Sequence, residues 1–234
     1  LEPSVVTTSE NGMVGVANMR IRGVDATRVN VNINGVTLND AESQVVYWYN
    51  IPNLGGMAQS VQLQRGLGAS NSGASSLGGA LNMLTLNASS EPYATADLSW
   101  GSFNTRLYGL IAGSGITKRG FSFDAAYNGL TSDGFIRGGQ TDQQSLFLSA
   151  GHYGDRSLLK VLAIIGEQKS GITWDGAYAE DLDADPTYNG RGKIKDQYGN
   201  VYYYPNETEL YRSILYCLIL LKIEIGRASC RERV

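Results

Sequence analysis

Apolar and polar residues alternate with a period of two along several stretches of the second hundred residues. YATADLSW (93–100) and FSFDAAYN (121–128) both place an apolar or small side chain at every second position. This alternation predicts β-strands that have one apolar and one polar face. Similar patterns predict further strands of about ten residues over Thr105–Ser114, Gln144–Tyr153 and Ser157–Glu167.

The connections between these strands alternate in length. Gly115–Gly120 and Gly154–Arg156 are short, whereas Thr131–Asp142 and Ser170–Asn206 are long and polar. Strands of about nine to eleven residues cross a bilayer when tilted, and outer-membrane barrels have short turns at one end and long loops at the other. The pattern favours a transmembrane β-barrel over a soluble β-sandwich, which has the same alternation. Aromatic residues near strand ends fit the membrane interfaces: Trp100, Tyr108, Tyr127 and Tyr153.

The first ninety residues contain shorter predicted strands separated by turns of small residues. RVNVNINGV (28–36) alternates valine and isoleucine with asparagine, which predicts a half-buried strand. Asn34-Gly35 is a strong hairpin signal, so Val36–Leu38 is the expected return arm. VQLQ (61–64) and ALNMLTL (80–86) are predicted to form two more short strands.

A glycine-rich stretch, QRGLGASNSGASSLGGALN (64–82), joins the last two of these strands. Gly68 and Gly73 have the spacing of a phosphate-binding loop, but Ala74 and Ser75 occupy the positions where that loop needs lysine and then serine or threonine. Because the lysine supplies the charge that contacts the phosphates, nucleotide binding is not supported. We expect the glycines to form turns within a packed unit, where a positive φ or a close backbone approach excludes a Cβ.

Composition and isolated residues narrow the function further. The net charge of −3, without a basic stripe, gives no argument for nucleic-acid binding. His152 is the only histidine, so no multi-histidine metal site or Ser-His-Asp triad is supported, and we expect it at a strand end near a short turn. Asp181, Asp183 and Asp185 alternate like calcium ligands, but Pro186 replaces the required glycine, which favours a solvated acidic loop. We predict no catalytic residue, no cofactor and no enzymatic activity.

The C-terminal residues differ in character from the rest of the chain. RSILYCLILLKIE (212–224) has an apolar run that is too short for a transmembrane helix and contains a lysine. IGRASCRERV (225–234) resembles one reading frame of a common sequencing-adapter oligonucleotide. Both cysteines, Cys217 and Cys230, lie in this region, so they give no argument for a disulfide or metal site. We predict that residues 209–234 are a non-native tail.

Four motifs in the first ninety residues form a set: RIRG (20–23), VNINGVTLND (31–40), VQLQRG (61–66) and SGASSLGGALNMLT (72–85). In this order and at these intervals they resemble the plug domain of TonB-dependent outer-membrane receptors. Asn34 stands where many members have aspartate, which keeps the turn and removes one charge. NDAESQ (39–44) and the aromatic residues after it are most similar to receptors of Bacteroidetes-type bacteria. The resemblance covers roughly residues 1–208.

The resemblance implies a mainly β fold in two parts. A small α+β plug domain is expected over residues 1–90, and the first strands of a large antiparallel transmembrane β-barrel over residues 91–208. Such barrels have about 22 strands, so the five predicted strands are a truncated beginning. The TonB box of the family would lie before Leu1.

The resemblance also implies a receptor and active transporter. Such a protein is integral to the Gram-negative outer membrane, contacts its lipid, binds a scarce nutrient outside and imports it with energy from TonB. The ligand stays open among a siderophore, haem, cobalamin, an oligosaccharide and a peptide. Two alternatives remain: a passive outer-membrane porin or adhesin barrel, and a secreted soluble carbohydrate-binding β-domain.

Candidate site residues follow from the resemblance. The polar inner face of a barrel should meet a polar plug surface, and the arginines of the two Arg-Gly pairs, Arg22 and Arg65, are expected to contact barrel carboxylates. The glycines of the plug motifs are expected to form turns: Gly23, Gly35, Gly66, Gly73, Gly78 and Gly79. Aromatic residues of the last long loop are candidates for stacking on a sugar or an aromatic siderophore: Trp174, Tyr202, Tyr203 and Tyr204.

Overall fold

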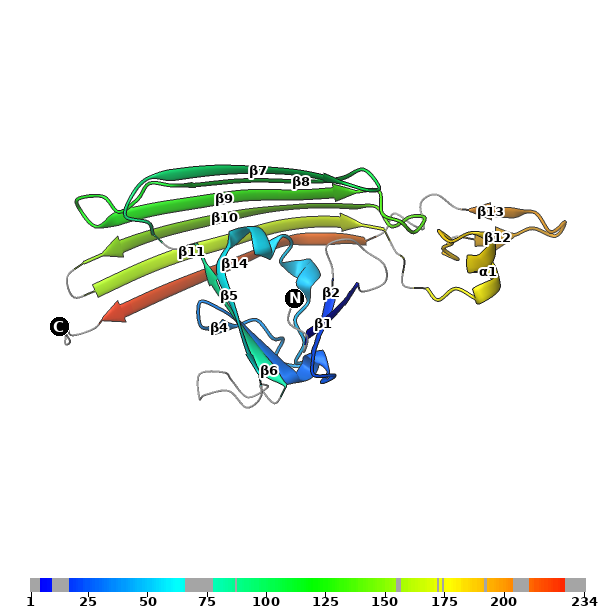
Figure 1. The fold of residues 1–234 in the computed structure, drawn as a ribbon, viewed down its shortest axis with the longest axis horizontal. Coiled ribbons are helices and arrows are strands. Elements are labelled where there is room, and N and C mark those ends of the chain that lie inside the picture. Colours follow the sequence, from blue (N-terminus) through cyan, green and yellow to red (C-terminus); the bar gives the residue numbers. More distant parts are fainter. Residues whose placement is uncertain are drawn as a thin grey trace.

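The chain folds into a large curved sheet with smaller N-terminal sheets against one of its faces, as the computed structural model in Figure 1 shows. The structure describes residues 5–9, 17–65, 78–86, 88–154, 157–171, 173, 175–191, 193–203 and 211–225. None of the described helices is long and apolar enough to span a membrane.

The large sheet has the strand order β14-β11-β10-β9-β8-β7, and each neighbouring pair is antiparallel. The five strands predicted in this region are confirmed: β7 (Tyr93–Gly101), β8 (Thr105–Gly113), β9 (Phe121–Ser132), β10 (Thr141–Tyr153) and β11 (Ser157–Ser170). β9, β10 and β11 are longer than predicted, because pairing with their neighbours continues into the polar segments at the loop end. His152 lies near the end of β10, as expected, and its ring is 4.6 Å from that of Phe121.

The sixth strand, β14 (Tyr211–Ile225), pairs with β11 from Ser157↔Ile225 to Ser170↔Tyr211. It occupies the place of the next strand in an antiparallel meander. Residues 226–234 lie outside the described part of the chain, and the assignment of 209–234 as a foreign tail stays a prediction.

The two faces of the large sheet differ in burial. On β9, Ser122, Asp124 and Asn128 are buried, whereas Phe123 and Tyr127 in the same strand are exposed. The strand register extends this division, so that each strand alternates between an inner face toward the N-terminal part and an outer face. The outer face is apolar over most of its height, as the period-two pattern predicts.

The small sheet has the order β4-β3-β6-β5 and is mixed. β3 (Val29–Ile33) runs parallel to β6 (Gly79–Thr85), while β4 (Val36–Thr37) and β5 (Ala58–Arg65) are antiparallel to their neighbours. A separate pair is formed by β1 (Val5–Ser9) and β2 (Ala17–Ile21). The helices described in this part are short 3-10 turns: η1 (Ala26–Arg28), η2 (Trp48–Asn50) and η3 (Leu54–Met57).

The prediction that β3 is half-buried was wrong, because every residue of β3 is buried. On the asparagine face, Asn32 has polar partners from neighbouring strands: its Nδ2 donates to Asn82 Oδ1 (2.9 Å), and Thr37 Oγ1 donates to its Oδ1 (2.9 Å). The predicted hairpin turn is confirmed, with φ of 49° at Asn34 and 83° at Gly35. The alternation of apolar and polar residues therefore predicted the position of the strand. Its degree of burial depends on the strands packed beside it.

The long segment after β11 projects beyond the loop end of the large sheet (Figure 1). It contains the short helix α1 (Ala179–Ala184) and a small hairpin of β12 (Lys193–Lys195) and β13 (Val201–Tyr203).

Candidate functional site

The N-terminal part is held against the inner face of the large sheet by one apolar cluster. Its buried members come from both parts: Ile33, Ile51, Leu54, Met57 and Met83 from the first, and Ala126, Phe147, Leu162 and Ile164 from the second. The expectation that a polar surface would meet a polar wall is therefore wrong for this region. Phe147, Leu162 and Ile164 lie at inward positions of β10 and β11, where they bury apolar area from both sides of the contact.

Two glycines let the parts approach closely. A Cβ added to Gly56, in η3, would lie 2.5 Å from Oδ1 of Asn128 on β9. A Cβ added to Gly166, on β11, would lie 2.7 Å from Cδ of Pro52. Real Cβ atoms do not approach other heavy atoms this closely, so both positions need glycine unless a neighbour moves.

Polar contacts between the two parts are also present. Asn53 has a left-handed φ of 54°, and its Nδ2 donates to the main-chain oxygen of Gln143 at 3.4 Å. Lys160 Nζ donates to the main-chain oxygen of Leu86 at 3.3 Å. Segment 51–57 thus combines apolar, glycine and polar contacts with the wall of β9, β10 and β11.

Arg22 and Arg65, the two arginines predicted to contact barrel carboxylates, are not part of segment 51–57. Arg22 is exposed, in the turn after β2, with a φ of 54°. Arg65 is exposed at the end of β5, opposite Gly79 of β6. Contact between these arginines and barrel carboxylates stays a prediction.

The glycines of the sequence motifs have definite local roles where they are described. Gly23 and Gly35 have φ of 75° and 83°, which favour glycine. A Cβ on Gly79 would lie 2.6 Å from the main-chain oxygen of Gln64, and one on Gly78 would lie 2.9 Å from Val24. Gly66 and Gly73 lie outside the described residues.

Ion pairs join the two long loops at the far end of the large sheet. Arg137 pairs with Asp185, and Asn189 Nδ2 donates to the main-chain oxygen of Arg137 at 2.8 Å. Hydrogen bonds from Thr187, together with the Arg137 guanidinium, lower the pKa of the Asp185 carboxyl below its ordinary value. Lys193 Nζ lies 3.9 Å from Asp181 Oδ1. Asp181 and Asp185 therefore have separate protein partners, and no cluster able to hold a metal is found among the described residues.

These loop contacts predict a dependence on pH. Because the folded-state pKa of Asp185 is lowered, its contribution to loop docking is present above the ordinary carboxyl pKa and is lost as the pH falls through the lowered value. Spin labels at residues 140 and 180, in a variant with Cys217 and Cys230 replaced by serine, should move apart on acidification. In Asp185→Asn they should be apart at neutral pH already. An unchanged separation in that variant would contradict the assigned role.

The aromatic residues proposed for stacking are only partly described. Tyr202 is exposed, and its hydroxyl donates to Asp196 Oδ2 at 3.1 Å, within the β12–β13 hairpin. Trp174, Tyr204 and the side chain of Tyr203 lie outside the described part. The ligand-stacking role stays a prediction.

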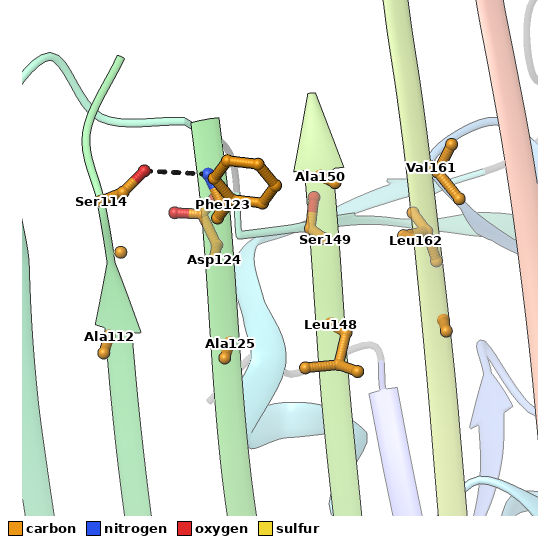
Figure 2. Close-up of a pocket in the computed structure, with 12 residues that line it drawn as sticks. Ala112, Ser114, Phe123, Asp124, Ala125, Leu148, Ser149, Ala150, Val161 and Leu162 are labelled. Atoms are coloured by element: carbon orange, nitrogen blue, oxygen red, sulfur yellow. Dashed lines mark hydrogen bonds between the residues drawn. The ribbon is translucent and has the colours of Figure 1, made fainter. Parts of the chain in front are cut away.

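A shallow apolar hollow of about 480 Å³ lies on the large sheet, shown in Figure 2. It forms because Ala112, Ala125 and Ala150 are small next to Phe123 and Leu148. These side chains belong to the outer face, away from the N-terminal part.

Comparison with protein families supplies the identity of the first part. Residues 2–80 match the profile of the family described as TonB-dependent Receptor Plug Domain. No match is found among curated protein sequences.

Solved structures share the fold of both parts. The ferric citrate transporter FecA, in the unliganded form, is 20% identical with a TM-score of 0.65, over 82% of this chain and 31% of that one. FpvA of P. aeruginosa, bound to heterologous pyoverdines, is 15% identical with a TM-score of 0.67, over 97% and 29%. The copper transporter OprC is 16% identical with a TM-score of 0.61, over 74% and 28%. The chain thus spans less than a third of these structures.

Fold and family together define a plug domain joined to the strands of a large antiparallel β-barrel. Residues 2–80 match the TonB-dependent receptor plug domain family, and the large sheet shares the fold of the barrel in the solved outer-membrane receptors. The segment 51–57 and the inner face of β9, β10 and β11 are the plug–barrel contact. The assignment to a Bacteroidetes-type source stays a prediction.

The sequence did not reveal the residues that make this contact. Pro52 and Gly56 come from one plug segment, Asn128 and Gly166 come from two different barrel strands, and none belongs to the four plug motifs. Among these four residues, Gly166 offered a sequence clue to this contact, because a glycine inside a predicted strand often marks a close approach of another backbone.

Proposed function

We propose that this chain belongs to an active transporter of the outer membrane, which binds a scarce nutrient outside the cell and imports it with energy supplied through TonB. The plug match supports the proposal, together with a plug seated on the inner face of the barrel strands through a buried apolar cluster. A plug in this position blocks the lumen, so passage requires that it be moved.

The proposal extends to the division of the chain. Residues 1–90 act as the plug, residues 91–208 supply the first barrel strands and two long extracellular loops, and residues 209–234 are a foreign tail. The nutrient is a small ligand such as a siderophore, haem, cobalamin, an oligosaccharide or a peptide, and the barrel is in contact with outer-membrane lipid.

Energy dependence tests this function. A receptor carrying this chain should support growth on its nutrient only while TonB and the proton-motive force are intact. The experiment compares growth in isogenic strains with and without TonB, with empty vector as the control. Growth that persists without TonB would favour a passive porin and overturn the proposal.

A further inference from the structure

The inner wall of the barrel becomes polar and uncharged on the loop side of the apolar cluster. Three successive rows of inward positions cross β9, β10 and β11 in register: Asn128–Ser145–Gly166, Leu130–Gln143–Gln168 and Ser132–Thr141–Ser170. All nine residues are buried. Apart from Gly166 and Leu130, their side chains are amides and hydroxyls, and none carries a charge.

Three side-chain polar atoms of this wall have no hydrogen-bond partner among the described protein groups. Nδ2 of Asn128, Oγ of Ser145 and Oε1 of Gln168 are buried without a hydrogen bond to the described protein groups. Buried polar atoms normally have partners, because leaving one unpaired forfeits the hydrogen bonds it makes to water. Three such atoms on neighbouring strands indicate a surface built to bind small polar groups that are not part of the wall itself.

Plug segment 51–57 covers the first row of this wall and reaches Gln143 in the second. Gly56 lies on Asn128 at one end of the first row, Pro52 lies on Gly166 at the other end, and Ser145 is between them. One hydrogen bond between this cover and the wall runs from Asn53 Nδ2 to the main-chain oxygen of Gln143 at 3.4 Å. Lifting the segment would also expose Ile51, Leu54 and Met57, so the closed position is favoured until work is done on the plug.

We propose that this wall is a stretch of the import route, uncovered when segment 51–57 moves, and that the transported molecule is neutral and rich in hydroxyl groups. The inference rests on the proposed function and adds a place and a chemical class to it. Hydroxyl groups can exchange hydrogen bonds with the amides and hydroxyls of the wall. A charged chelate would need countercharges, which these rows do not supply.

Thiol labelling of the wall tests the route without knowledge of the nutrient. Ser145→Cys, with Cys217 and Cys230 replaced by serine, is exposed to three reagents in intact cells: a neutral sugar-bearing methanethiosulfonate, a sulfonate one and an ammonium one. Labelling by the neutral reagent should be at least about tenfold faster in cells with TonB than without it, because the open state is then populated. Tyr198→Cys, on the exposed hairpin, is the control and should be labelled equally in both strains.

A disulfide lock provides the matched second variant. The Cβ position of Gly56 lies 2.6 Å from Cγ of Asn128, so the two β-carbons are within about 4 Å, which suits a disulfide. In Gly56→Cys with Asn128→Cys and Ser145→Cys, oxidation should abolish the labelling of residue 145, and reduction should restore it. Each single cysteine at 56 and 128 controls for the substitutions themselves.

The outcomes separate the inference from the function. TonB-dependent growth without TonB-dependent labelling of residue 145 overturns the route, and faster labelling by a charged reagent overturns the chemical class. Growth that does not depend on TonB overturns the proposed function instead.

Discussion

Replacing Gly56 with leucine is expected to unseat the plug from the barrel wall. Even a Cβ at this position would lie 2.5 Å from Oδ1 and 2.6 Å from Cγ of Asn128, so a leucine fits only if Asn128 or segment 51–57 moves. Overpacking a close contact costs about 1–3 kcal/mol. The plug of Gly56→Leu should become sensitive to protease in detergent-solubilised receptor, and cells should become permeable to large antibiotics.

The adjacent glycine supplies the control. A Cβ on Gly55 would meet no atom within 4 Å; Gly55 and Gly56 are both exposed in the same 3-10 turn, so the two positions differ in the space for a side chain and not in burial. Gly55→Leu should therefore keep the protease resistance of the unmodified protein. Equal resistance of the two variants would show that the contact between Gly56 and Asn128 does not hold the plug.

Replacing Phe147 with alanine is expected to have the largest effect on stability. Phe147 is fully buried at the centre of the cluster that joins plug and barrel. Truncation of a buried phenylalanine costs about 3–5 kcal/mol, from lost burial and the cavity left behind. The variant should release the plug at a lower urea concentration than the unmodified receptor, measured by protection of plug peptides from protease.

The next residue on the same strand provides the comparison. Leu148 points to the outer face and is 43% exposed. Leu148→Ala should leave plug protection unchanged. An effect as large as that of Phe147→Ala would mean that β10 itself, and not the plug contact, had been weakened.

The strands of the barrel could be predicted from the sequence because their signal is local. Alternation within β7 and β9 reports the two faces of each strand wherever one face meets lipid. The turn at Asn34-Gly35 was predictable for a similar reason, since its positive φ angles restrict the residue types directly. Four short motifs then identified the plug family.

The contact between plug and barrel could not be predicted in the same way. Its residues belong to segments separated by up to 131 positions, from Ile33 to Ile164, and they become neighbours only when the sheet curves around the plug. One feature of the sequence did indicate that the barrel strands are buried on their inner face. β10 and β11 contain apolar side chains on both faces, as in Leu146-Phe147-Leu148, and such runs indicate burial on two sides.

The sequence by itself determined the β class, the barrel strands and the plug family, because periodicity, turn chemistry and motifs are properties of short segments. Only the tertiary structure decided that β3 is buried on both faces, that Gly56 and Gly166 are points of close approach, and that Asn128, Ser145 and Gln168 share one covered wall. These features depend on which surfaces meet, and packing between distant segments is what sets them.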